Sequence, residues 1–180
     1  MTISLGKRMT AVVATALLLI AASGCSSTTQ TGMDGSRHEL FESLQALSGA
    51  SSAVAVVEVI DQTTTTDDIP TTISTVKVIE SFTPEGLAEA LAVDPSKVAD
   101  SIQVRQMGAA GMGLPYSILQ IGDKYLLFLT PSGLEGKEAV QFYITGGSAG
   151  MYTIDGDTYV HGPFEEGDVL PEKLTASDLR

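Results

Sequence analysis

The chain has 180 residues, of which 22 are acidic and 10 are Lys or Arg, so its formal net charge is −12 at pH 7. This charge argues against nucleic-acid binding, because basic side chains must neutralise the phosphates. The single cysteine, Cys25, excludes a disulfide within the chain. The length suits one globular domain with its own core.

The first 24 residues have the layout of a secretory signal. Lys7 and Arg8 supply positive charge, and residues 11–22 form a twelve-residue apolar run interrupted only by Thr15. A transmembrane helix takes about 20 apolar residues, so a permanent span is the weaker interpretation. We therefore expect residues 1–24 to be a signal peptide and the chain to be exported.

Ala22-Ser23-Gly24-Cys25 resembles the lipobox of bacterial lipoproteins. The resemblance implies cleavage between Gly24 and Cys25, a diacylglycerol on the Cys25 thiol, and a lipid-anchored protein on the extracytoplasmic face of the cell membrane. The family prefers Leu where this chain has Ala22. The alternative is an ordinary signal peptide followed by an incidental cysteine. One acyl chain binds a membrane only reversibly, whereas two or three on one cysteine would hold the protein stably.

Cleavage would leave 156 residues with 8 basic and 22 acidic side chains, a formal charge of −14. This charge favours solubility and argues against a polybasic grip on anionic lipid. Residues 25–35 continue as SSTTQTGMDG after Cys25, a polar sequence typical of a flexible tether. We expect residues 36–180 to form a single β-rich domain.

The domain begins with a predicted helix over residues 37–48. Ser36 and Glu39 have the spacing of a capping box, and Gly49 ends the pattern. Apolar residues at helical spacing fall on one face: Leu40, Phe41, Leu44 and Leu47.

Short runs rich in Val, Ile and Leu then predict strands. The first two, over residues 52–62 and 71–82, should pair antiparallel. A helical excursion follows, with Thr83 and Asp94 as helix caps. The remaining predicted strands are residues 101–107, two runs around Gly122-Asp123 within 116–131, residues 139–145, and a hairpin within 151–162 whose turn is Asp155-Gly156. The C-terminal residues predict irregular structure with a short helix.

This pattern predicts a mainly β, α+β fold: a small OB-like Greek-key barrel with an N-terminal helix and a helical insertion. The runs VAVVEVI, TVKVIESF, IQVRQ and GDKYLLFL resemble the netrin/TIMP-like OB modules over roughly residues 53–130. The eukaryotic modules carry disulfides that this chain lacks. Those that inhibit metalloproteases use a free N-terminal cysteine amine, which a lipidated Cys25 would not offer, so that activity does not carry over.

No motif predicts a catalytic, cofactor-binding or metal-binding residue. Residues 87–102 resemble a helix-turn-helix but are acidic, and we expect no nucleic-acid partner. The glycine-rich residues 108–113 and 145–150 predict a flexible loop at the barrel rim and a turn or bulge, not a phosphate loop. Asp155, Asp157 and Asp168 do not have the number and spacing of ligands that a calcium loop needs. His38 and His161 are predicted to lie on the surface.

We therefore expect a non-catalytic interaction or binding module at the cell envelope, with an envelope protein as a possible partner. The alternative is an enzyme or enzyme accessory acting on an envelope substrate, which a pocket holding His161 and two carboxylates would favour. A third interpretation, ligand capture for a transporter, needs a large apolar cavity. Ser26 and Ser27 lack the Asp that, in the lipoprotein family, retains chains at the inner membrane of two-membrane bacteria.

Overall fold

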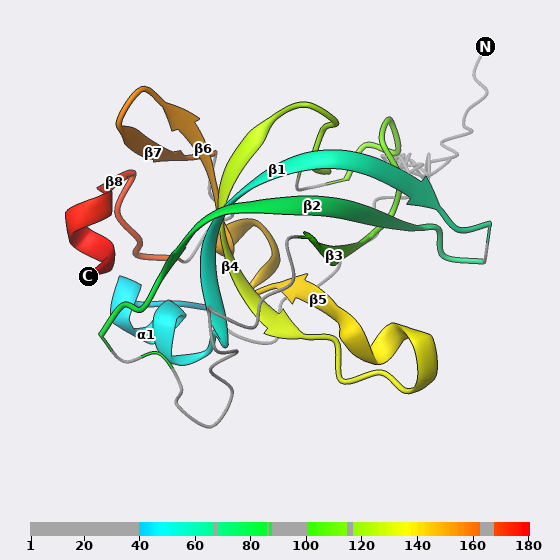
Figure 1. The fold of residues 1–180 in the computed structure, drawn as a ribbon, viewed down its shortest axis with the longest axis horizontal. Coiled ribbons are helices and arrows are strands. Elements are labelled where there is room, and N and C mark those ends of the chain that lie inside the picture. The colour runs from blue at the N-terminus through cyan, green and yellow to red at the C-terminus, as the bar shows by residue number, and fades with distance from the viewer. Residues whose placement is uncertain (1–39, 67, 86, 88–100, 115–116, 163–167) are drawn as a thin grey trace, which may run out of the picture. The chain divides into compact units, whose positions relative to one another are not determined.

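The computed structural model describes residues 40–66, 68–85, 87, 101–114, 117–162 and 168–180. Gly32–Arg180 forms one compact unit, and its described part is mainly β with few helices (Figure 1). The strands are β1 (Ala53–Thr64), β2 (Thr71–Phe82), β3 (Ser101–Met107), β4 (Lys124–Pro131), β5 (Gln141–Ile144), β6 (Met151–Asp155), β7 (Thr158–His161) and β8 (Lys173–Thr175). The helices in the described ranges are α1 (Leu44–Gly49) and the 3-10 helices η2 (Gly136–Val140), η3 (Gly147–Gly150) and η4 (Ala176–Leu179).

The strand pairings close a circuit of five strands. β1 pairs antiparallel with both β2 and β4, and β2 pairs antiparallel with β3. β3 runs parallel to β5, which returns antiparallel to β4. β4 also pairs with β6, and β7 and β8 continue the sheet outward from there (Figure 1). β5 and β6 therefore share one edge of β4, with η3 between them.

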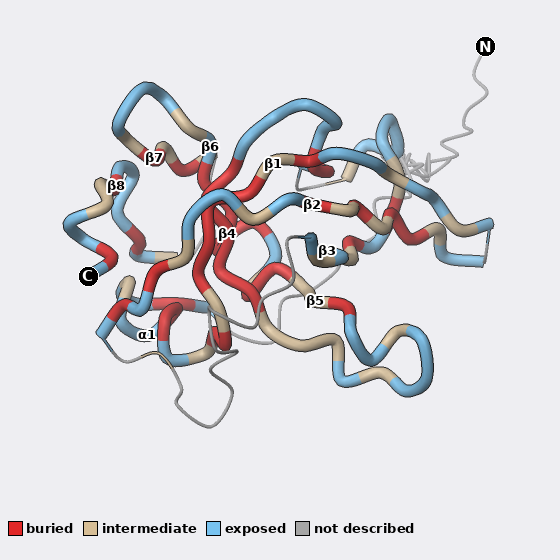
Figure 2. Tube along the Cα trace, viewed as in Figure 1, coloured by how far each residue is buried: buried red, intermediate tan, exposed pale blue. Residues whose placement is uncertain are grey.

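β4 and the first part of β1, residues 53–59, are buried on both faces, which explains their nearly continuous apolar sequences. Successive side chains of a strand point to opposite faces. Along β4, Tyr125, Leu127 and Leu129 enter one core, while Leu126 and Phe128 enter another. The tube of β4 is accordingly coloured as buried along most of its length (Figure 2).

The two cores are built from different elements. The first, which we call the circuit core, draws on all five strands of the circuit: Ala55, Val57, Val59, Val76, Val104, Leu119, Tyr125, Leu127, Leu129, Ile144 and Met151. The second, the outer core, joins β1, β2 and β4 to α1, the β6–β8 strands and η4: Phe41, Leu47, Val54, Val56, Phe82, Leu126, Phe128, Ala149, Tyr152, Tyr159, Leu170, Leu174 and Leu179. Both cores lie inside the compact unit, which therefore carries what it needs to fold alone.

The prediction of a strand-rich α+β fold is confirmed, and β2 and β3 have the predicted bounds. β1 has its predicted place and continues to Thr64, antiparallel to β2. The predicted helical excursion lies almost wholly outside the described residues.

The prediction of a helix over residues 37–48 is wrong for its described first part. The helix starts at Leu44, with the Ser43 hydroxyl accepting from the Ala46 amide. Upstream, the Phe41 amide donates to Asp168 Oδ1 at 2.9 Å and the Phe41 carbonyl accepts from the Val169 amide at 2.9 Å. These long-range bonds hold Phe41 out of the helix. Ser36 and Glu39 lie outside the described residues.

Three smaller predictions are also wrong. Ala139 and Val140 belong to η2, so β5 begins only at Gln141. The hairpin turn is Gly156-Asp157, one residue later than predicted, because the glycine adopts a φ of 59° at the first turn position. The segment predicted to be irregular contains β8, whose Leu174 side chain enters the outer core.

Adjacent residues of β4 provide a test of the two cores. We expect Leu127→Ala to lower the free energy of unfolding by about 2–5 kcal/mol and Phe128→Ala by about 3–5 kcal/mol, because each leaves a cavity in a different core. Val140→Ala, at a side chain that is 71% exposed, should change it by less than about 0.5 kcal/mol. Urea unfolding of the three variants measures this. If either β4 variant matched the Val140 control, that face of β4 would not carry a core.

Candidate functional site

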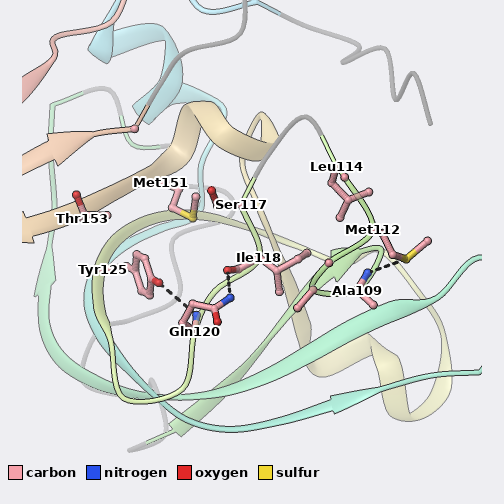
Figure 3. A pocket seen from close by; sticks show the side chains of 13 residues that line it. Ala109, Met112, Leu114, Ser117, Ile118, Gln120, Tyr125, Met151 and Thr153 are labelled. Carbon is pink, nitrogen blue, oxygen red and sulfur yellow. Dashed lines mark hydrogen bonds between the residues drawn. The ribbon is translucent and has the colours of Figure 1, made fainter. Parts of the chain in front are cut away.

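A pocket of about 510 Å³ lies beneath the glycine-rich loop that follows β3 (Figure 3). We call it the loop pocket. Its described lining comes from that loop, from the segment before β4, and from β4, β6 and the end of β7: Ala109, Ala110, Gly111, Met112, Gly113, Leu114, Ser117, Ile118, Gln120, Tyr125, Met151, Thr153 and Gly162. Met112 and Leu114 lie across the pocket from Met151 and Thr153 in Figure 3.

The loop pocket has an apolar floor and a polar rim. Ile118, Tyr125 and Met151 are buried, and Tyr125 and Met151 also belong to the circuit core. Ser117, Gln120 and Thr153 are exposed and carry hydroxyl or amide groups. An apolar cavity with a few polar groups at its edge is the usual design of a small-molecule site.

The glycine-rich loop is fixed at its first residue. The Gly108 amide donates to the Pro70 carbonyl at 2.6 Å, and the Gly108 carbonyl accepts from Thr72 Oγ1 at 2.8 Å. Gly108 has a φ of 89°, and the Leu114 side chain packs directly over its Cα. Further along the loop, the Ala109 amide donates to the Met112 sulfur at 3.2 Å. The prediction of a loop over residues 108–113 is confirmed.

Two glutamines, the buried Gln106 and the half-buried Gln62, explain why the pocket's floor segment is not a strand. We predicted a strand before Gly122-Asp123, and the described residues 117–121 form none. The Gln106 side chain donates to the Ser117 carbonyl and accepts from the Leu119 amide, both at 3.0 Å. Gln62 Nε2 donates to the Leu119 carbonyl at 2.5 Å. Side-chain amides thus form the hydrogen bonds to the backbone of this segment that a neighbouring strand would otherwise form.

Tyr125 couples the floor to the start of β4. Its hydroxyl accepts from the Gln120 amide at 3.2 Å and donates to Asp123 Oδ2 at 3.3 Å. Burial is the main cause that raises the pKa of the Tyr125 phenol, and the Asp123 carboxylate adds to it. Tyr125 is the only ionisable side chain in the described lining, and at neutral pH it is uncharged.

His161 is buried, so the prediction that it lies on the surface is wrong. Its Nδ1 lies 2.8 Å from the Gly162 carbonyl oxygen and its Nε2 lies 3.1 Å from the Ala149 carbonyl oxygen. The ring also packs edge-on against Tyr152, with centroids 4.6 Å apart. The outer core therefore encloses His161, which does not line the loop pocket.

The other residues weighed from sequence are not brought together in the described structure. Asp155 and Asp157 are exposed in the β6–β7 hairpin, whereas Asp168 accepts from the Phe41 amide. Within the described ranges, no group of three His, Cys, Asp or Glu side chains could hold a metal ion. Residues 145–150 form η3 and its entry, consistent with the predicted turn or bulge. His38, Gly24 and Cys25 lie outside the described residues.

The sequence pattern indicates the glycine-rich loop but not the residues that form a pocket beneath it. Ile118 and Met151 come from segments far apart in the chain, and Gln106 shapes the floor from β3. A sign of this role was present, since Gln106 alternates with Val104 on the inward face of β3. No helix in the described part of the chain is long and apolar enough to cross a membrane.

Comparison with known proteins gives no match for this chain among family models, curated proteins or solved structures.

Gly108 and Gly111 test how the loop is held. Both have a positive φ, so an alanine strains either position by about 1–2 kcal/mol. A Cβ at Gly108 would also lie 2.5 Å from Leu114 Cδ1, whereas one at Gly111 meets nothing within 4 Å. We expect Gly108→Ala to cost about 1–3 kcal/mol more than Gly111→Ala in urea unfolding, because Leu114 must move. Equal losses of unfolding free energy in the two variants would mean that Leu114 does not hold the loop in place at Gly108.

Tyr152 provides a test at alkaline pH. Burial, followed by the nearby Asp168 carboxylate, raises the pKa of its phenol, and its hydroxyl has no hydrogen-bond partner among the described residues. A raised folded-state pKa contributes stability that is present below the unfolded pKa of about 10 and is lost as pH rises above it. Tyr152→Phe should therefore unfold less readily than the parent above about pH 10.

At pH 7, Tyr152→Phe should change the free energy of unfolding by less than about 1 kcal/mol, because it removes a buried hydroxyl without breaking a hydrogen bond. The alkaline sensitivity should shrink but persist, since burial also raises the pKa of Tyr125 and Tyr159. Urea unfolding at pH 7 and at alkaline pH measures both effects. An unchanged pH dependence would contradict the assignment to Tyr152.

Proposed function

We propose that this protein is a lipid-anchored, non-catalytic interaction or binding module on the extracytoplasmic face of the cell membrane. The lipobox-like Ala22-Ser23-Gly24-Cys25 supports the location. In this proposal, the chain is cut between Gly24 and Cys25 and is held by acyl chains on Cys25. Residues 26–35 then connect the anchor to the folded domain, and the membrane partner is bound covalently through lipid, not through the acidic surface.

We infer that the five-strand circuit is an OB-like Greek-key barrel. Its support is the closure of the circuit through the β1–β4 pairing, together with the parallel β3–β5 pair. A small five-stranded barrel of this kind fills its interior with side chains and binds ligands on its outer face and loops. The circuit core matches the first feature and the position of the loop pocket matches the second.

The observation that carries the binding role is the loop pocket itself. Its floor is tied to the circuit core through Tyr125 and Met151, so it is preformed by the fold. Its roof is the loop that Gly108 fixes to the β1–β2 connection. A preformed concave site on a tethered domain suits capture of a ligand or a protein segment at the cell envelope.

Cys25→Ser tests the anchor in cells of a bacterium that exports the protein. We expect the parent to take up an alkyne-labelled fatty acid and to sediment with membranes, and the Cys25→Ser variant to lose both properties. Ser26→Ala, one residue away, serves as the matched control and should behave as the parent does. If Cys25→Ser remained in the membrane fraction at the parent's level, the lipid anchor would be refuted.

Crosslinking in the same cells, followed by mass spectrometry, tests the interaction role. A recurrent envelope protein that is recovered with the parent and the Ser26→Ala control, but not with Cys25→Ser, would support a tethered module. Recovery of that protein with Cys25→Ser at the same level would show that the association does not depend on tethering.

A further inference from the structure

We propose that the loop pocket binds an uncharged amphiphile, with one hydrocarbon chain on the floor and a hydroxyl or amide group at the rim. The inference rests on the proposed binding role and names the ligand class for the same site. Four features of the pocket carry it: the charge of its lining, its size, the arrangement of floor and rim, and the nature of its roof.

The described lining has no charged side chain at neutral pH, in a chain whose net charge is −12. A charged ligand group would lose its hydration there without gaining an opposite charge. The described part of the lining therefore favours a neutral ligand.

The volume suits one small ligand. A pocket of about 510 Å³ lies within the range of about 300–1,000 Å³ found for small-ligand sites. Replacing water by hydrocarbon there is favourable because most of the described lining is apolar. Ile118, Tyr125 and Met151 offer a buried floor over which such a chain can lie.

The polar groups sit where a head group would emerge. Ser117, Gln120 and Thr153 are exposed and belong to the lining of the pocket (Figure 3). Gln120 Nε2 donates to the Ile118 carbonyl at 2.8 Å, which fixes the amide at the edge of the floor. The Ser117 hydroxyl and the Gln120 amide can donate to and accept from a neutral head group. The Thr153 hydroxyl donates to the Val160 carbonyl at 3.0 Å and can therefore only accept.

The roof can adapt to chains of different length. Gly111 and Gly113 adopt positive φ with nothing packed against them, and Met112 is the apolar side chain between them. Methionine is unbranched and polarizable and fills irregular apolar space, which is why it recurs at tolerant binding surfaces. This roof predicts selection for an apolar chain without selection for one exact shape.

The test uses the compact unit Gly32–Arg180 with its methionine methyl groups labelled with carbon-13. This unit contains four methionines. Of the three that the structure describes, Met112 and Met151 line the pocket and Met107 does not. The protein is titrated with hexanol, octanol and decanol, and with octanoate and octylammonium as charged counterparts of octanol. NMR spectra report which methyl groups respond and give each dissociation constant.

We expect the Met112 and Met151 signals to shift and saturate while the Met107 signal stays in place. Affinity for the alcohols should rise roughly four-fold for each added methylene, the factor that corresponds to about 0.8 kcal/mol. Octanoate and octylammonium should bind at least about ten-fold more weakly than octanol, because their charge meets no partner in the described lining.

Met112→Gln and Met107→Gln form a matched pair, since the two side chains are 43% and 46% exposed and only Met112 lines the pocket. We expect Met112→Gln to weaken octanol binding by roughly ten-fold and Met107→Gln to leave it unchanged. Three results would overturn the proposal: no saturable shift with any alcohol, equal affinity for the charged counterparts, or equal weakening by both variants. None of these would alter the Cys25-dependent fractionation, so failure of the ligand class is distinguishable from failure of the anchored module.

Discussion

The burial of β4 on both faces is the constraint on which the rest of the structure depends. Tyr125, Leu127 and Leu129 fill the circuit core, and Leu126 and Phe128 fill the outer core, so one short strand is shared by both. A slip of one residue would exchange every side chain between the two cores. The edges of β4 resist such a slip, because β1 pairs along one edge and β5 and β6 along the other. The two cores are therefore stabilised together.

The position of the loop pocket follows from this arrangement. Tyr125 is both the first core residue of β4 and part of the pocket floor, and its hydroxyl holds Gln120 and Asp123 in the turn before the strand. Met151 plays the equivalent role at the start of β6, which pairs with β4. The floor is thus an extension of the circuit core and has its rigidity. The roof, by contrast, is a loop with several glycines, so the pocket combines a fixed surface with an adaptable one.

The sequence predicts the strands correctly where burial of side chains alone determines the backbone conformation. The runs of β2 and β3 predict those strands to the residue, because alternating or continuous apolar side chains have one favourable arrangement in a sheet. It was insufficient where side chains distant in sequence take over backbone hydrogen bonds. Asp168 holds Phe41 out of the predicted helix, and Gln62 and Gln106 hold Leu119 out of the predicted strand. Such bonds leave no periodic pattern in the sequence. This one cause accounts for the wrongly predicted helix start, the wrongly predicted strand and the pocket that the sequence does not indicate.

The charge distribution connects the two proposals. If Cys25 carries the anchor, the acidic domain is repelled by the anionic head groups of the membrane to which it is tethered, and the tether sets how far it stands away. The same repulsion lowers the local concentration of anionic amphiphiles, while neutral ones are unaffected. The described lining of the pocket is uncharged and favours the neutral amphiphiles that remain. In this proposal, two effects disfavour charged ligands. The electrostatic field of the acidic domain repels anionic amphiphiles, and any charged group would lose its hydration on the apolar floor.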